Sequence, residues 1–124
     1  GHATGDSVLI EVAERTQDLL REKPGALAAR LGGDEFALLL THGDTETTEE
    51  LGRRLVAMLA QPYTGVHDVP ITASVGIAFA HKAATDPTEV LRGADLAMYD
   101  AKIAGGNRCM RYADHLESMQ LARH

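Results

Sequence analysis

The 124-residue sequence has no tryptophan, a single cysteine and no long uninterrupted run of apolar residues. Aromatic residues make up 4% of the chain against 44% for all hydrophobic residues, so its core must be built mainly from aliphatic side chains. Cys109 has no second cysteine with which to form an intramolecular disulfide, which suits a reducing compartment. The apolar runs are too short to span a bilayer. We therefore expect a cytoplasmic domain that makes no membrane contact of its own.

Positive charge is also scarce, because the chain has 12 Lys and Arg against 18 Asp and Glu, which gives a net charge of −6. Proteins that bind a nucleic-acid backbone depend on clustered Lys and Arg, so we expect no nucleic-acid partner. A single nucleotide is not excluded, since a metal ion and a few local cations can hold one triphosphate. The length corresponds to one domain.

The most informative stretch is Gly32-Gly33-Asp34-Glu35-Phe36, which separates two apolar runs, 26–31 and 36–41. This pattern predicts a β-hairpin. The paired glycines let backbone N–H groups approach a ligand without interference from a Cβ atom. Successive strand residues point to opposite faces, so we expect only one of the two acidic side chains to face a given ligand. Carboxylates beside phosphate oxygens are the ligands that Mg²⁺ prefers.

The remaining elements follow from periodicity and turn signals. We predict helices over 5–21, over 45–60 and from Asp86 to the Gly105-Gly106 pair, and strands over 63–66, 69–80 and 108–112. Asp6 stands at the expected entrance of the first helix, where capping the helix would be its ordinary role. Asp86 or Thr88 is expected to cap the last helix. Gly76, inside a strand, indicates the close approach of another backbone.

Three further segments of the chain match sequence patterns that accompany this hairpin sequence in the same order. Residues 1–6 resemble the pattern GHxxGD, residues 71–78 resemble ITxSxGIA, and residues 94–102 resemble ADxALYxAK. Together with residues 32–36 they resemble the GGDEF family, whose active members are diguanylate cyclases. These bacterial enzymes join two GTP molecules into cyclic di-GMP. The resemblance covers residues 1–112, and we expect residues 113–124 to be a helical tail or a linker to a further domain.

The resemblance implies an α/β (α+β) fold with a central, mostly antiparallel five-stranded sheet flanked by helices, similar to the adenylyl cyclase and polymerase palm. The family's opening strand, with a DxDxFKxIND-like sequence, precedes the GHxxGD segment. It carries a metal-binding aspartate and a guanine-binding asparagine. Because the sequence begins at Gly1, we expect that strand to lie upstream or to have been removed.

The resemblance also implies roles for individual residues. Asp34 is a metal ligand or the base for the ribose 3′-hydroxyl, and Glu35 helps to hold a second metal position. The metal is Mg²⁺ or Mn²⁺. Gly32 and Gly33 lie against the triphosphate.

Two other residues match substrate-binding positions of the family. Asp6 aligns with the aspartate that hydrogen-bonds guanine, and this role can coexist with capping. Lys102 aligns with a phosphate-binding lysine of the family, although without that resemblance it would be interpreted as an ordinary solvated lysine near a helix C-terminus.

Two departures from the family pattern bear on activity. Many members carry an inhibitory RxxD site for cyclic di-GMP before the hairpin, but Lys23 and Ala26 stand at its arginine and aspartate positions. We therefore expect no product inhibition through that site. Many members also have Gly-Arg-Asn after the helix, whereas this sequence has Gly105-Gly106-Asn107, with Arg108 following.

The leading hypothesis is a Mg²⁺-dependent diguanylate cyclase domain that works as a homodimer, with fused sensory or EAL domains as partners. The alternative is a degenerate module that binds GTP and regulates an attached EAL phosphodiesterase domain. A third possibility is a purely dimerising or protein-binding module.

Overall fold

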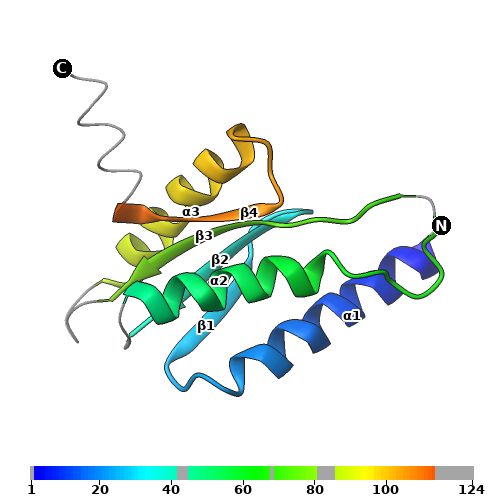
Figure 1. Cartoon of the computed structure of the whole chain (residues 1–124), viewed down its shortest axis with the longest axis horizontal. Coiled ribbons are helices and arrows are strands. Elements are labelled where there is room, and N and C mark those ends of the chain that lie inside the picture. Colours follow the sequence, from blue (N-terminus) through cyan, green and yellow to red (C-terminus); the bar gives the residue numbers. More distant parts are fainter. Residues whose placement is uncertain (1, 42–44, 68, 81–85, 114–124) are drawn as a thin grey trace.

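The computed structural model describes residues 2–41, 45–67, 69–80 and 86–113. That part of the chain forms a single sheet with helices on both faces (Figure 1). In chain order the elements are α1 (His2–Leu20), β1 (Ala26–Arg30), β2 (Glu35–Leu40), α2 (Thr45–Leu59), β3 (Ser74–Phe79), α3 (Pro87–Ile103) and β4 (Arg108–Arg111). The α/β class, the three helices and the β1–β2 hairpin are confirmed, with bounds close to those predicted.

The sheet differs from the expectation of five mostly antiparallel strands. Among the described residues it has four strands in the order β1-β2-β3-β4. Only β1 and β2 pair antiparallel, while β2–β3 and β3–β4 are both parallel. The connections explain this, because α2 and α3 each return the chain to the edge where the preceding strand began. The expected, mostly antiparallel arrangement is therefore wrong for this part of the chain.

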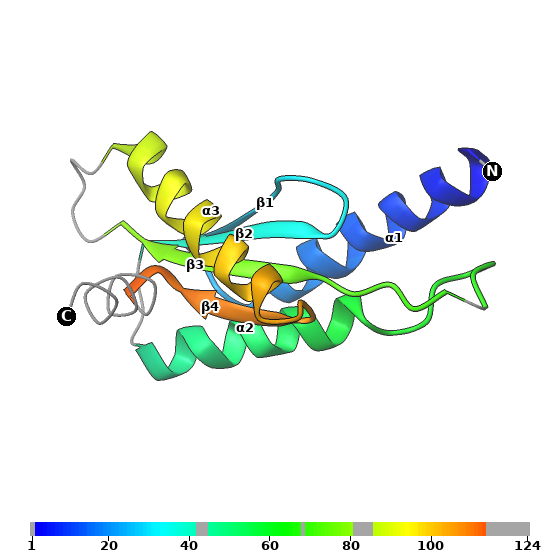
Figure 2. The same cartoon turned by 90° about the horizontal axis from the view of Figure 1, so that it is seen from above.

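The sheet is covered on its two faces by different helices (Figure 2). The larger core lies on the face of α1 and α2, where Leu38, Leu55 and Ile77 are almost fully buried. The smaller core lies under α3 and is built from small residues, Ala37, Ala78, Val90 and Ala94. Small side chains bring α3 close to the sheet, and this fixes the end of α3 near the β1–β2 turn.

Of the two strands predicted over 63–66 and 69–80, the first is not formed and the second is confirmed only over β3, residues 74–79. Tyr63 and Val66 make only an isolated bridge, closed by a turn in which Gly65 has φ +79°. Residues 69–73 are not part of the sheet. Pro70 lacks the N–H donor that a ladder requires. β3 begins at Ser74, which is in register with the first residues of both neighbouring strands, Glu35 and Arg108.

The helix ends give one confirmation and one correction. The Asp86 side chain accepts a hydrogen bond of 3.0 Å from the backbone N–H of Thr88, and Pro87 is the first residue of α3, as predicted. In contrast, α1 begins at His2, so Asp6 lies within the helix and does not cap it. Asp6 is exposed to solvent.

Arg15 joins α1 to the end of α2. Its guanidinium donates hydrogen bonds to the carbonyl oxygens of Met58, Gln61 and Pro62, at 2.8, 3.0 and 2.5 Å. It also lies 3.9 Å from the centroid of the Tyr63 ring. The arrangement satisfies carbonyl groups that the end of a helix leaves without intrahelical partners.

No helix in the described part of the chain is long and apolar enough to cross a membrane. The prediction of a helical tail or linker over 113–124 falls almost entirely outside the described residues.

Candidate active site

The turn between β1 and β2 is held by its own backbone. The N–H groups of Leu31 and Gly32 both donate to the carbonyl oxygen of Glu35, at 2.7 and 3.4 Å. A Cβ atom on Gly32 would overlap the Glu35 carboxylate, which is the end of a flexible side chain and would have to move aside. Gly33 has no neighbour within 4 Å of the place where a Cβ would stand. This side of the turn is therefore open to a ligand.

Lys102, in the last turn of α3, reaches both acidic residues of the turn. Its Nζ lies 3.1 Å from Asp34 Oδ1 and 3.1 Å from Glu35 Oε2. The expectation that only one of the two carboxylates faces a given ligand is wrong. Strand alternation does not apply to them, because β2 begins at Glu35 and Asp34 still belongs to the turn. The two carboxylates can therefore act on the same cation.

The electrostatics of this cluster follow from those contacts. Hydrogen bonds first to Asp34 and then to Glu35 raise the pKa of Lys102 above its ordinary value. All three side chains remain solvent-accessible, with exposed fractions of 44% for Lys102, 48% for Asp34 and 27% for Glu35. The cluster is a surface site that a soluble ligand can reach directly.

The donor set fits a divalent cation, because one cation already touches an oxygen of each carboxylate. Mg²⁺ is bound in other proteins by one or two carboxylates together with phosphate oxygens and water. Within the described ranges, no group of three or more His, Cys, Asp and Glu side chains is arranged to hold a metal. Asp34 and Glu35 would thus supply two ligands, and the remaining positions would be filled by substrate, water or a further segment.

A row of three strand residues extends the site across the sheet. Glu35 is in register with Ser74, and Ser74 is in register with Arg108. Residues in register point to the same face of a sheet, and for Glu35 this is the face of Lys102. Ser74 is 1% exposed, and its Oγ has no hydrogen-bond partner among the described residues.

The loop after α3 lies over this row. Gly105, Gly106 and Asn107 all have positive φ, at 122°, 71° and 51°. A Cβ atom on Gly106 would stand 3.3 Å from Ser74 Oγ. Arg108 donates from Nε to the carbonyl oxygen of Gly106 at 3.1 Å. The sequence pattern did not single out Ser74 and gave Arg108 only by its position, because the strand register that unites the two residues is not visible locally.

The other predicted site residues make no hydrogen bond or ion pair with this cluster among the described residues, so the structure does not join them to it directly. Asp6 makes no hydrogen bond or ion pair with Asp34, Glu35 or Lys102 among the contacts of the described chain. Lys23 and Ala26 lie at the start of β1, where the N–H of Ala26 donates to the carbonyl of Lys23 at 3.2 Å. The structure thus brings together Asp34, Glu35 and Lys102, but not Asp6.

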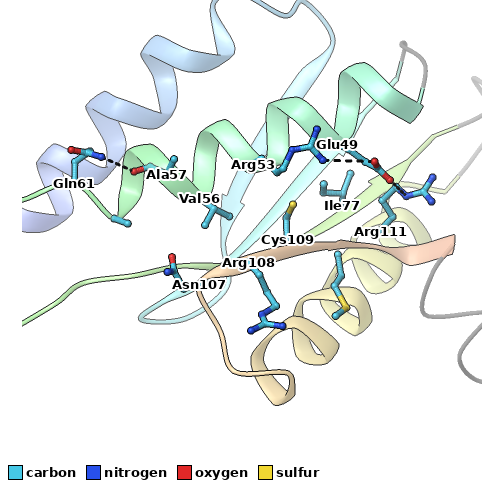
Figure 3. Close-up of a pocket in the computed structure, with 12 residues that line it drawn as sticks. Glu49, Arg53, Val56, Ala57, Gln61, Ile77, Asn107, Arg108, Cys109 and Arg111 are labelled. Carbon is cyan, nitrogen blue, oxygen red and sulfur yellow. Dashed lines mark hydrogen bonds and ion pairs between the residues drawn. The ribbon is translucent and has the colours of Figure 1, made fainter.

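A groove of about 700 Å³ lies on the opposite face, between α2 and β4. Cys109 points from β4 toward α2, and Arg53 and Arg111 flank Glu49 at one end (Figure 3). Arg108 lines the groove at its edge, but its guanidinium points away from α2, toward the end of α3. The groove is therefore separate from the cluster around Lys102.

The fold and the cluster define an α/β domain in which a glycine-and-carboxylate hairpin meets a lysine from the helix across the sheet. The family model described as "Diguanylate cyclase, GGDEF domain" matches residues 1–108. The chain belongs to the GGDEF family, as the sequence motifs predicted.

Curated relatives agree with this assignment. The chain is 43% identical over 108 residues to the bifunctional diguanylate cyclase/cyclic di-GMP phosphodiesterase MucR of Pseudomonas aeruginosa, covering 86% of this chain and 16% of that protein. It is 38% identical over 105 residues to the diguanylate cyclase TpbB of Pseudomonas aeruginosa, covering 82% and 24%. It is 35% identical over 112 residues to the cyclic di-GMP phosphodiesterase PdeR of Escherichia coli, covering 89% and 17%. The chain thus spans less than a quarter of the length of these three relatives.

Proposed function

We propose that this domain condenses two GTP molecules into cyclic di-GMP and pyrophosphate, with Mg²⁺ or Mn²⁺, as a homodimer. The observation that supports this most directly is the contact of Lys102 with both carboxylates of an intact Gly32–Phe36 signature. One cationic side chain and two metal-binding carboxylates at an open glycine turn form an arrangement suited to a metal–triphosphate.

Each residue has a defined task in this proposal. Gly32 and Gly33 leave room for the triphosphate beside the turn. Asp34 and Glu35 hold the divalent cations, and Asp34 is also the candidate base that takes the proton of the ribose 3′-hydroxyl. The bound cations would lower the pKa of that hydroxyl and neutralise charge on the phosphates. Lys102 then binds phosphate oxygens.

The bond changes are those of an in-line displacement at each α-phosphorus. The 3′-oxygen of one GTP bonds to the α-phosphorus of the other, pyrophosphate leaves, and the hydroxyl proton passes to the carboxylate or to water. Catalysis of this kind depends chiefly on positioning and charge stabilisation. One domain holds one GTP, so two domains must face each other across a two-fold axis to close the symmetric product.

Two parts of the proposal involve residues outside the cluster. Asp6 would accept hydrogen bonds from guanine N1–H and N2–H, which are both donors. The family's opening strand would precede Gly1 and supply another metal-binding aspartate. This role of Asp6 rests on the family resemblance alone.

The second candidate function is a module that binds GTP and regulates an attached EAL phosphodiesterase domain. Gly106, at the position where many members have arginine, favours it, because a charge-assisted hydrogen bond to phosphate is worth about 1.5–3 kcal/mol. PdeR, a relative named as a cyclic di-GMP phosphodiesterase, contains a segment that is 35% identical to this chain over 112 residues.

The test compares the domain with Asp34→Ala and Asp18→Ala variants, each carrying the upstream strand that the proposal includes. Asp18 is an aspartate of α1 whose side chain is 61% exposed. Asp18→Ala is the control, because it makes the same substitution at a position outside the site. Incubation with GTP and Mg²⁺ should give cyclic di-GMP by chromatography from the parent and from Asp18→Ala, but none from Asp34→Ala. A folded, dimeric sample that binds GTP and forms no product would instead support the regulatory module.

A further inference from the structure

We propose that Arg108 is the second phosphate-binding cation of this domain and takes the place of the arginine that is absent at position 106. This inference rests on the proposed binding of GTP at the Lys102 cluster. Arg108 belongs to β4, the strand that follows the loop. The loop itself carries no cationic side chain.

The sheet register places Arg108 in the site. Glu35, Ser74 and Arg108 form one row across β2, β3 and β4. Neighbouring strands are about 4.8 Å apart, so the outer two residues are about 10 Å apart at the backbone. The long side chains at both ends shorten that gap, and a metal–triphosphate can extend along the row.

Gly105 in the loop leaves room for the Arg108 side chain, and the carbonyl of Gly106 holds it. Its Nε donates to the Gly106 carbonyl, so the side chain folds back over the loop toward the end of α3. A Cβ atom on Gly105 would lie 3.1 Å from Nη2 of Arg108. Any side chain at Gly105 would therefore crowd the guanidinium. Figure 3 shows the guanidinium beside the last turn of α3, the turn that carries Lys102.

The charges of the cluster call for such a cation. Lys102 provides one positive charge, and it is shared between Asp34 and Glu35. Arg108 is exposed, and no carboxylate of the described residues forms an ion pair with it. Four of its five N–H donors have no recorded acceptor, and the guanidinium fork suits the geometry of phosphate oxygens.

The experiment measures binding of GTP, GDP and GMP, with Mg²⁺, by calorimetry to the parent chain carrying the upstream strand, as in the cyclase test, and to its Arg108→Gln and Arg53→Gln variants. Arg53 is the matched control, because it is 63% exposed and belongs to the groove on the other face of the sheet. We expect Arg108→Gln to weaken GTP binding about tenfold or more. The loss should shrink from GTP to GDP to GMP, and Arg53→Gln should leave all three affinities within about twofold.

A merely structural role for Arg108 would lower the melting temperature without this dependence on phosphate number. Arg108→Lys keeps the positive charge but not the planar guanidinium, so its affinity for GTP should fall about threefold. This variant replaces Arg108→Gln in the experiment if Arg108→Gln does not fold.

Equal GTP affinity for the Arg108 and Arg53 variants would overturn the inference and leave the cyclase proposal intact. Arg108-dependent GTP binding without cyclic di-GMP would sustain it and overturn the cyclase. A parent chain that binds no GTP would overturn both.

Discussion

The carbonyl oxygen of Ala94 in α3 lies directly over the Cα atom of Gly76 in β3. A Cβ atom on Gly76 would overlap that oxygen and would lie 2.5 Å from the backbone nitrogen of Met98. The prediction that another backbone closely approaches Gly76 is therefore confirmed, and the partner is the helix that carries Lys102. This contact sets the depth at which α3 lies on the sheet.

Replacement of Gly76 by alanine should lower the free energy of unfolding by about 3 kcal/mol or more, because rigid backbone atoms cannot move aside. The measurement is urea denaturation followed by circular dichroism. Gly5→Ala is the control, since Gly5 has no neighbour within 4 Å and lies within α1. It should be neutral or stabilise by up to about 1 kcal/mol. Equal effects of the two substitutions would contradict the packing of α3 on β3.

Arg15→Ala should lower the free energy of unfolding by about 2–4 kcal/mol, since it removes three hydrogen bonds to carbonyls and the contact with Tyr63. Arg15→Lys should recover less than half of the loss, because an ammonium lacks the planar fork. Arg21 is the control on the same helix, where its pair with Asp18 is 76% and 61% exposed. Arg21→Ala should cost about 0.5 kcal/mol or less; a larger loss there than at Arg15 would refute the proposed link between α1 and α2.

Local structure was predictable because local chemistry decides it. The glycine turn before Asp34 and the Asp86 cap were correct to within a residue. Sheet order was not, since it depends on which strands meet after a helical crossover. The apolar residues before Ser74 suit a strand by composition, yet Pro70 removes a donor and the ladder begins only at Ser74.

The site was predictable only in part, and through the family resemblance. Nothing local links Lys102 to Asp34, which is 68 positions earlier in the chain. The pairing of both carboxylates with one ammonium required the turn geometry, which simple strand alternation misrepresents. Ser74 and Arg108 join the site through the register of three strands, a property that no single segment carries.

Cys109 should react slowly with iodoacetamide in the folded chain. Burial raises the pKa of its thiol, and Glu49 adds to the shift while Arg53 opposes it. The thiolate is the reactive form, so alkylation at pH 8 should be several-fold slower than in denaturant, as followed by mass spectrometry. Comparable rates in both conditions would contradict the burial of the sulfur against α2.

The same shift has a consequence for stability. The unfolded chain loses the thiol proton near pH 8.5 and the folded chain at higher pH. This contribution to stability is therefore complete below pH 8.5 and declines as the pH rises toward the folded pKa. Cys109→Ala should remove that part of the alkaline decline.

Ser74 and Gly106 should be energetically coupled. Gly106→Ala is expected to cost about 1–2 kcal/mol, from its φ of 71° and from the 3.3 Å approach of a Cβ to Ser74 Oγ. Ser74→Ala should be neutral or stabilising, because it removes a buried hydroxyl that has no partner among the described residues. The double variant should cost less than the sum of the two, by about 0.5 kcal/mol or more. Strict additivity in urea denaturation would show that the loop does not rest on Ser74.

Cyclic di-GMP should not inhibit the domain through the turn before β1, if the domain is the proposed cyclase. Lys23 and Ala26 replace the arginine and the aspartate of the inhibitory motif, and alanine cannot accept the hydrogen bonds that guanine donates. The rate of product formation should stay unchanged as cyclic di-GMP is added. The combined substitution of Lys23→Arg and Ala26→Asp supplies the missing groups at the same turn and should create inhibition. Strong non-competitive inhibition of the parent chain by cyclic di-GMP would refute this prediction.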